Sequence, residues 1–333
     1  MTEPQTITRR RAMQIVAAAG ASCLLPGASS ARVTSQTWRG TALGGEASIQ
    51  IHVADRRYGE ELLGQCVAEI RRLEQVFSLY RSSSALSQLN RHGGLDAPPA
   101  DLVSLLEKAR CFSDMTEGAF DVTAQPLWDL YAEHFQDPAA DPDGPNRNDI
   151  LRILELVNYR AVNVSTHRIA LGRPGMGITL NGIAQGYITD RVSDLLRSAG
   201  LTHVLVDLGE LRALGRHPEG RSWLVGIRSP VDVDQMTGSI PLESAALATS
   251  GGYGTRFDAT GTYHHLFDPR TGFCTNRYLD MTVIAPNATM ADALSTGFSS
   301  MEPVQIAYAT GMLSSVTVRA TLPDGQLQTW PGS

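Results

Sequence analysis

The stretch LNGIAQGY, residues 180–187, places two glycines between a strand-like segment and a run of residues with helical periodicity. Glycine adopts backbone conformations that other residues avoid, and a helix that begins here directs unpaired N–H groups outward. Such a bend favours a bound anion, for example a pyrophosphate. The alternative is a tight turn without a ligand. The glycines from Gly175 to Gly182 do not have the GxGxxG spacing of a dinucleotide-binding fold.

Regular elements are expected on both sides of this bend. A helix is predicted from Tyr187 to Gly200, a strand follows at 203–207, and a hairpin precedes the bend at 161–171. Further strands are predicted at 47–53, 223–227, 281–285 and 315–320, and further helices at 62–77, 102–109, 150–157 and 288–299. Because helices and strands do not alternate strictly, the pattern favours an α+β fold with largely antiparallel sheets packed with helices.

Composition excludes two classes of function. The 333 residues include 28 basic and 34 acidic side chains, a net charge of −6, which argues against binding DNA or RNA because such surfaces concentrate Lys and Arg. Lys108 is the single lysine, and the residues directly before it, Leu105 to Glu107, lack the glycine that precedes the lysine of a P-loop. A phosphate-binding P-loop is therefore absent.

The N-terminal residues have the order of an export signal. Basic residues at 9–11 precede an apolar run at 15–25 and small residues at 29–31, and the apolar run is too short to span a membrane. Adjacent arginines are typical of the twin-arginine route. We therefore expect a signal peptide over 1–31, one domain over 32–333, a periplasmic location and no transmembrane segment in the mature chain.

Oxygen donors share one face of the predicted helix at 288–299. Asp292 and Thr296 are four residues apart, so their side chains point the same way. Such a pair holds Mg²⁺ when a third protein oxygen and substrate phosphates complete the octahedron. The alternative is a solvated or capping Asp and a Thr bonded to its own backbone.

The stretch YHHLFDPRTG, residues 263–272, joins a predicted strand to a turn. His264 and His265 point to opposite faces of a strand, so they do not readily bind one metal, but one of them can transfer a proton. Asp268 to Gly272 is expected to be a turn.

Taken together and in chain order, these segments resemble the ApbE family of flavin transferases, whose motifs are S-x-Y…S…LN, GxFDxT…PL, D-x-GGIAKGY…D, ATSG-x-Y…H-x-x-DPxTG and ADALxT. The matching residues are Ser78-x-Tyr80, Ser84 and Leu89-Asn90; Gly118 to Thr123 with Pro126-Leu127; Asn181 to Tyr187 with Asp190; Ala248 to Tyr253 with His265 and Asp268 to Gly272; and Ala291 to Thr296. Twin-arginine export and the opening at 40–45 are similar to NosX-like members associated with nitrous oxide reduction.

The resemblance implies a T-fold-like architecture and a reaction. FMN would pass from FAD, through a phosphoester bond, to a Thr or Ser hydroxyl of an exported or membrane redox protein, such as a NosR-like protein, with release of AMP and a requirement for Mg²⁺.

It also implies the site residues. Mg²⁺ would bind Asp292, Thr296 and the backbone carbonyl of Gly182. His265 would take the acceptor hydroxyl's proton, with Asp292 as the competing base. The FAD site would be lined by Leu43, Tyr80, Asp121, Val122, Thr123, Thr179, Gln185 and Leu266.

Two residues depart from the family pattern. Thr179 stands where the family has Asp, and Gln185 stands where it has Lys, so a negative charge is lost near the adenine or ribose and a positive charge near the phosphates. A neutral amide stabilises a phosphate less than a charged donor does. The alternative function is therefore a periplasmic FAD carrier, an accessory to nitrous oxide reduction, that binds FAD without transferring FMN. A glycan hydrolase would need two facing acids, and the spacing identifies no such pair.

Overall fold

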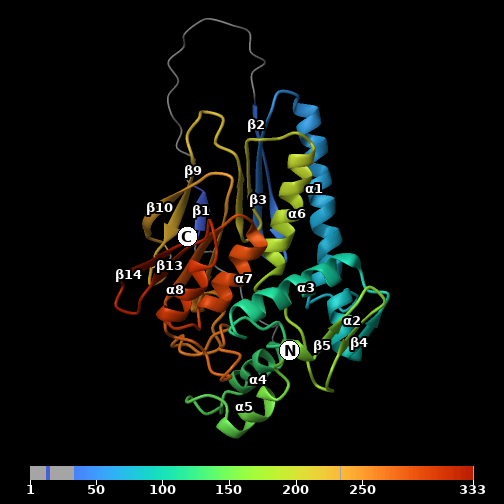
Figure 1. The fold of residues 1–333 in the computed structure, drawn as a ribbon, viewed down its shortest axis with the longest axis vertical. Coiled ribbons are helices and arrows are strands. Elements are labelled where there is room, and N and C mark those ends of the chain that lie inside the picture. The colour runs from blue at the N-terminus through green and yellow to red at the C-terminus, as the bar shows by residue number, and fades with distance from the viewer. Residues whose placement is uncertain (1–12, 16–33, 233, 333) are drawn as a thin grey trace, which may run out of the picture.

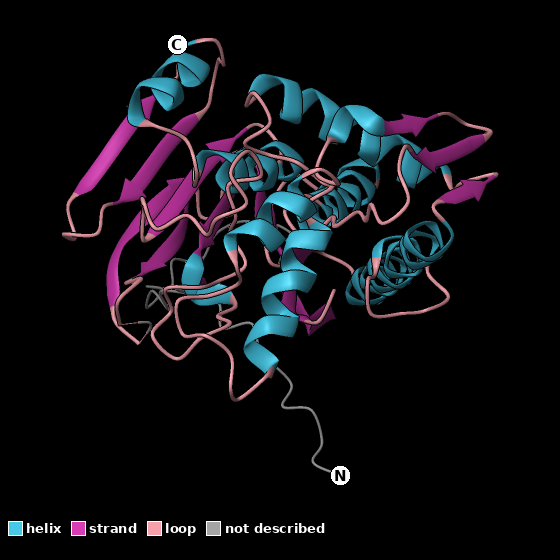
Figure 2. Ribbon diagram, turned by 90° about the horizontal axis from the view of Figure 1, so that it is seen from below, coloured by secondary structure: helices cyan, strands magenta, loops and turns pink. Residues whose placement is uncertain are grey.

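The computed structural model describes residues 13–15, 34–232 and 234–332 (Figure 1). Among them, every strand pairing is antiparallel and helices pack beside the sheets (Figure 2), so the predicted α+β class is confirmed. The large sheet has the strand order β14-β13-β12-β11-β8-β7-β3-β2. Its strands are β2 (Thr34–Ala42), β3 (Gly45–Val53), β7 (Val204–Asp207), β8 (Leu211–Leu214), β11 (Ala246–Gly251), β12 (Asp280–Ala285), β13 (Thr317–Thr321) and β14 (Leu327–Pro331).

Two further sheets have three strands each. The strands β4 (Gly94–Asp96), β6 (Arg168–Leu171) and β5 (Val162–Val164) include the predicted hairpin, which is confirmed. The other sheet contains β1 (Met13–Ile15), β9 (Trp223–Arg228) and β10 (Met236–Leu242). The rest of the expected signal peptide lies outside the described residues.

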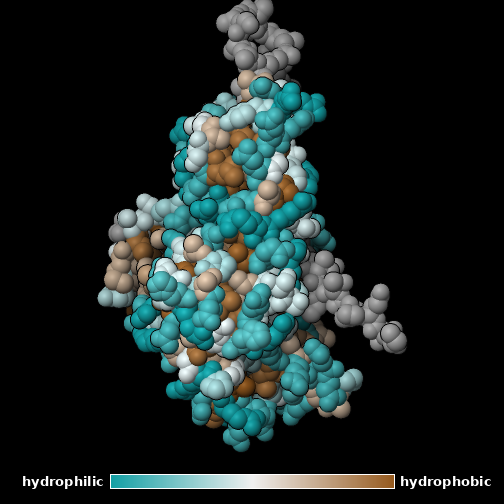
Figure 3. Space-filling view, turned by 90° about the vertical axis from the view of Figure 1, so that its right-hand side faces the viewer, coloured by the Kyte–Doolittle hydropathy of each residue, from teal (hydrophilic) through white to brown (hydrophobic). Residues whose placement is uncertain are grey.

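The helices are α1 (Arg56–Phe77), α2 (Ala85–His92), α3 (Ala100–Met115), α4 (Gln125–Gln136), α5 (Arg147–Leu154), α6 (Ala184–Ser198), α7 (Ala288–Phe298) and α8 (Pro303–Gly311), with short 3-10 turns at Tyr159–Ala161 and Gly252–Gly254. None of the helices in the described part of the chain combines the length and the hydrophobicity needed to span a bilayer. The face in Figure 3 is mostly hydrophilic, and its apolar residues form separate small groups.

The two faces of the large sheet belong to different cores. On β7, Val204 and Val206 join the core beneath the helices, whereas Leu205 between them joins the core of the β9–β10 sheet. On β11, Ala248 and Leu247 divide in the same way. Successive side chains of a strand point to opposite faces. The large sheet is therefore covered by α1, α6 and α7 on one side and by the β9–β10 sheet on the other.

The segment before the glycine bend differs from the expected strand. Residues 176–180 are irregular, because their backbone bonds to loops and side chains instead of to a neighbouring strand. The side chain of Asn90 both donates to the Ile178 carbonyl and accepts from the Ile178 N–H, each at 2.8 Å. The helix after the bend begins at Ala184, before the predicted start at Tyr187, because the Leu180 carbonyl accepts from the Ala184 N–H (2.8 Å).

A buried ion pair fixes α6 against the first residues of α7. The Asp190 Oδ1 atom accepts from the Ala288 N–H at 2.8 Å and from Arg212 Nη1 at 2.6 Å, and Oδ2 accepts from the Thr289 N–H at 2.9 Å. Asp190 and Arg212 are 9% and 8% exposed. Asp190 therefore caps α7 from another helix, and its charge is balanced by Arg212.

We expect Asp190→Ala to lower the free energy of unfolding by about 3–5 kcal/mol, because it leaves the Arg212 charge buried without its main partner. Urea denaturation followed by circular dichroism measures the loss. Asp194→Ala is the matched control, since Asp194 lies on the same helix, 3.4 Å from Arg212 Nη1, but its side chain is 52% exposed. The control should lose less than about 1 kcal/mol. Equal losses in the two variants would contradict the capping role.

Candidate functional site

The glycine bend and the oxygen donors of α7 face each other. A Cβ atom on Gly182 would lie 2.7 Å from Thr296 Oγ1, and one on Gly186 would lie 2.3 Å from the Ala288 carbonyl oxygen and 2.8 Å from Asp292 Cβ. Residues 182, 186 and 190 thus oppose residues 296, 292 and 288, as in two antiparallel helices in close contact. Only glycine fits at 182 and 186, because a side chain would occupy the space where the helices touch.

Asp292, which lies on α7, is buried against the beginning of α6. It is 4% exposed, and its Oδ2 atom accepts from the Gly186 N–H at 2.9 Å. Gly186 lies in the first turn of α6, where backbone N–H groups lack partners within the helix and attract anions. The expected anion site at the bend therefore already holds one carboxylate. Of the alternative stated for Asp292, the solvated carboxylate is wrong, whereas a capping contact is present, made to α6 and not to its own helix.

Thr296 lies one turn further along α7. Its Oγ1 atom is 3.3 Å from Ser250 Oγ, at the end of β11, so its hydroxyl bonds to a neighbouring strand and not to its own helix. A cation beside Asp292 and Thr296 would meet oxygen donors: a carboxylate, a hydroxyl and the nearby backbone of Gly182. Within the described residues no three His, Cys, Asp or Glu side chains form a metal cluster. This donor set suits a hard cation such as Mg²⁺ and not zinc.

Gln185 lies over the turn that joins β7 to β8. Its Nε2 atom is 3.4 Å from the Leu208 carbonyl oxygen, and a Cβ on Gly209 would lie 2.3 Å from the same Nε2. Gly209 has a φ of +111°, a conformation that side chains rarely adopt. The turn thus holds the Gln185 amide close to the backbone at the start of α6.

A pocket of about 900 Å³ lies beside the bend, within the size range of ligand-binding cavities. Asn181 lines it, directly before Gly182, and so does Tyr80, which is 75% exposed. The other lining residues are Leu79, Asn90, Arg91, His92, Gly93, Gln125, Pro126, Trp128, Asp129, Leu171, Arg173, Pro174, Gly175, Met176 and Gly177. Of the residues predicted to bind FAD, Tyr80 alone lines this pocket.

The segment Asp121–Thr123 uses its side chains to build a turn. The Asp121 carboxylate accepts from the Thr123 N–H at 2.7 Å, from Thr123 Oγ1 at 2.6 Å and from the Tyr159 N–H at 3.0 Å. Burial raises the pKa of Asp121, and these hydrogen bonds oppose the rise. The Val122 carbonyl accepts from the Thr179 N–H at 2.8 Å. The side chains of Asp121 and Thr123 are therefore bonded within the turn, which lies next to Thr179.

Leu43 and Tyr80 are linked through the end of α1. Leu43, at φ +46° in the turn between β2 and β3, donates its N–H to Glu74 Oε1 at 2.9 Å. The other carboxylate oxygen of Glu74 is 3.3 Å from Arg81 Nη2, one residue after Tyr80. These two predicted FAD residues, 37 positions apart in the sequence, are thus held near one helix terminus.

The strand expected at the adjacent histidines is wrong: they lie in a loop, where His264 forms an isolated β-bridge with Arg256. Their rings meet edge to face, with centroids 6.4 Å apart. His264 is 3% exposed, and burial lowers its pKa; its Nε2 atom is 3.1 Å from Asn276 Oδ1. His265 is half-buried, with Nδ1 3.2 Å from the Thr255 carbonyl oxygen. Because a carbonyl only accepts, Nδ1 carries the hydrogen, and Nε2 is the basic nitrogen of the neutral ring. Leu266, the next residue, is buried.

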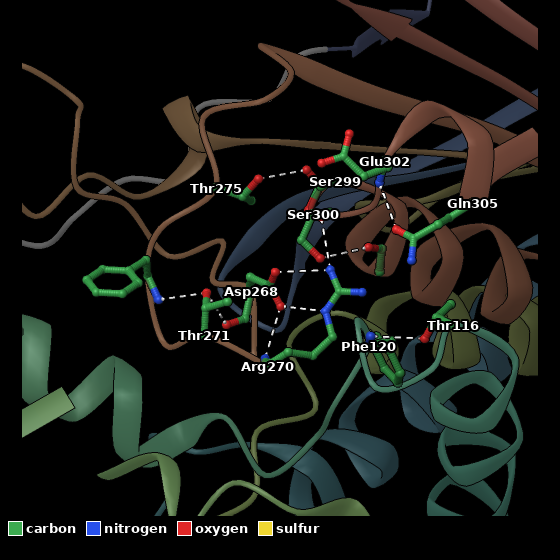
Figure 4. A network of polar contacts seen from close by, with 12 residues as sticks. Thr116, Phe120, Asp268, Arg270, Thr271, Thr275, Ser299, Ser300, Glu302 and Gln305 are labelled. Carbon is green, nitrogen blue, oxygen red and sulfur yellow. Dashed lines mark hydrogen bonds and ion pairs between the residues drawn. The ribbon is translucent and has the colours of Figure 1, made fainter. Parts of the chain in front are cut away.

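The predicted turn Asp268–Gly272 is confirmed, and it holds the far end of α7. Arg270 forms two hydrogen bonds with the Asp268 carboxylate, at 2.8 and 3.0 Å, and its Nη2 atom donates to the Ser300 carbonyl at 3.1 Å (Figure 4). A cation at a helix C-terminus is favourable. Asp190 at one end and Arg270 at the other therefore fix the helix that carries Asp292 and Thr296.

Several pocket residues were not identified from the sequence. Trp128 directly follows the Pro126-Leu127 motif, but an aromatic residue at such a position is more often part of the core. Arg91 and Arg173 carry no local signal, since their place at the pocket depends on how α2 and the segment before the bend pack.

Comparisons with known proteins identify chains that are similar to this one. The model of the ApbE family matches residues 43–317. A protein of Treponema pallidum named FAD:protein FMN transferase is 35% identical over 245 residues, covering 68% of this chain and 67% of that protein. A protein of Vibrio cholerae with the same name is 32% identical over 242 residues, covering 69% and 71%.

Solved structures are similar over nearly the whole chain. The ApbE protein of Thermotoga maritima has a TM-score of 0.76 at 27% identity, covering 89% of this chain and 96% of that one. The flavinyl transferase ApbE of Pseudomonas stutzeri has a TM-score of 0.77 at 25% identity, covering 90% and 95%. The family match over most of the chain, the relatives above 30% identity and the shared fold lead to one conclusion: this chain belongs to the ApbE family.

Proposed function

We propose that this protein is an FAD:protein FMN transferase that moves FMN from FAD to a Thr or Ser hydroxyl of a redox protein, through a phosphoester bond, with release of AMP. The observation that carries the proposal is the contact of Asp292 and Thr296 with the glycine bend at Gly182 and Gly186. It brings hard oxygen donors to the glycine bend, where a divalent cation held by them would attract a diphosphate. The names of the curated relatives support the same reaction.

The residues present fit a divalent cation. Asp292, Thr296 and the carbonyl of Gly182 would hold Mg²⁺, which would neutralise the charge that develops on the departing AMP. Asp292 keeps one carboxylate oxygen bonded to the Gly186 N–H, so its orientation is fixed before any ligand enters. That bond also makes Asp292 the poorer general base. The basic Nε2 atom of His265 is the better group to take the proton of the acceptor hydroxyl.

The neighbouring pocket offers complementary surfaces for FAD. Tyr80 and Trp128 present aromatic rings that can stack on a flat ring system, and Arg91 and Arg173 add positive charge. These arginines lie in the same pocket as Asn181, next to the bend, where the phosphates would bind. They therefore compensate in part for the cation that Gln185 does not supply.

We propose further that the protein acts in the periplasm after twin-arginine export, with a NosR-like membrane protein as acceptor and with a role like that of the NosX-like members. The basic and apolar segments within residues 1–31 support export.

The competing function is a carrier that binds FAD without transferring FMN. Purified protein is incubated with FAD, Mg²⁺ and the flavin-accepting domain of a membrane redox protein. AMP release and a fluorescent acceptor band support the transferase. Tight FAD binding with neither product would establish the carrier instead.

We expect Asp292→Asn to lower transfer by on the order of 100-fold or more, because the loss of a carboxylate ligand removes several kcal/mol of charge stabilisation. The amide oxygen of Asn can still accept from the Gly186 N–H, so the fold should persist. AMP release measured by chromatography reports the rate. Asp194→Asn, on the exposed side of α6, is the control and should behave as wild type. Unchanged turnover in Asp292→Asn would refute the metal assignment.

Gln185→Lys should raise the rate of transfer about tenfold, since a charged donor near the phosphates stabilises the transition state more than an amide does. A lysine here keeps a donor toward the Leu208 carbonyl. Gln185→Met has similar length without charge or donor and should not gain activity. Single-turnover kinetics with saturating FAD separate the rate from the affinity. If lysine and methionine give equal rates, charge at this position does not limit transfer.

A further inference from the structure

We propose that Ser250 is a positioning residue: it accepts the hydrogen of the Thr296 hydroxyl and so turns the lone pairs of Thr296 Oγ1 toward the cation. The inference rests on the proposed function and assigns a role to a residue outside the three predicted metal donors. A series of hydroxyl groups joins β11 to α7.

Three hydroxyl groups meet where β11 packs on α7. Ser250 Oγ lies 2.8 Å from Ser295 Oγ and 3.3 Å from Thr296 Oγ1. Ser295 Oγ lies 3.0 Å from the Asp292 carbonyl oxygen, one turn earlier in the same helix. Ser295 is 1% exposed, so water does not compete for the hydrogen bonds that its hydroxyl forms.

The direction of each hydrogen bond follows from counting hydrogens. A hydroxyl has one hydrogen to donate, and a carbonyl oxygen can only accept. Ser295 therefore donates to the Asp292 carbonyl and must accept from Ser250. Ser250 has then used its hydrogen, so in its contact with Thr296 it must accept, and Thr296 must donate.

This direction has a consequence for Thr296. A helical Thr commonly donates to a carbonyl in the preceding turn of its own helix. Here Ser295 already donates to the Asp292 carbonyl, the acceptor that Thr296 would reach, and Ser250 takes the Thr296 hydrogen instead. The lone pairs of Thr296 Oγ1 then point away from Ser250. A Cβ on Gly182 would lie 2.7 Å from that atom, so the glycine bend borders this hydroxyl.

A group that orients a metal ligand through a hydrogen bond typically changes metal affinity by about 10- to 100-fold when it is removed. A serine that merely attached β11 to α7 would instead affect stability. The two roles therefore separate when divalent-cation affinity and thermal stability are measured on the same variants.

The test uses the full chain with FAD and Mn²⁺, which reports binding by electron paramagnetic resonance, with Mg²⁺ as competitor. Ser250→Ala should weaken cation binding by about 10- to 100-fold and raise the Mg²⁺ concentration needed for half-maximal AMP release. Its melting temperature, its affinity for FAD without metal and its rate at saturating Mg²⁺ should stay close to wild type. Ser250→Thr keeps the acceptor oxygen and should restore binding.

Ser299→Ala is the matched control, because the Ser299 hydroxyl donates to the Thr296 carbonyl at 2.6 Å and does not contact the Thr296 side chain. It should leave cation affinity unchanged. Wild-type affinity in Ser250→Ala, or an equal loss in Ser299→Ala, would overturn the role of Ser250 while leaving the transferase intact. A wild-type protein that binds no divalent cation with FAD would overturn both the inference and the metal-dependent reaction.

Discussion

The contact between α6 and α7 holds the glycine bend against Asp292 and Thr296. Each helix offers a buried carboxylate to the first turn of the other: Asp190 accepts from the N–H groups of Ala288 and Thr289, and Asp292 accepts from the N–H of Gly186. Unpaired N–H groups at a buried helix N-terminus are costly, and a carboxylate there is favoured by the helix dipole. Both carboxylates can reach the opposite helix only because the two helices are antiparallel and close together.

The short distance between the two helices explains why residues 182 and 186 are glycines. At Gly186 the nearest atoms to an added Cβ are the backbone oxygen and carbonyl carbon of Ala288, which cannot move aside as a flexible side chain would. At this position the backbone of α6 therefore packs directly on the backbone of α7. This packing of the helices holds Asp292 and Thr296 at the bend. A preformed site of this kind loses little conformational entropy when its ligands bind.

The motifs of the ApbE family divide by what their residues do in this chain. Asn90 holds the segment before the bend, Asp121 closes a turn, and Arg270 binds the end of α7. These residues keep the scaffold in place. Asp292, Thr296 and Tyr80 lie where a ligand would meet them, at the bend and at the neighbouring pocket. A family motif thus contains both residues that support the scaffold and residues that lie beside the bend or the pocket, which sequence alone does not separate.

The class of fold, the helix at 288–299, the hairpin and the shared face of Asp292 and Thr296 could be predicted from the sequence, because apolar periodicity and helical spacing act between residues that are close along the chain. The sequence did not reveal the irregular backbone at 176–180, which long-range bonds from Asn90 impose. Nor did it reveal that Gly186 binds Asp292, that Asp190 caps α7, or that Ser250 meets Thr296. Those contacts join residues 46 to 106 positions apart, so only the packing of helices on the sheet decided them.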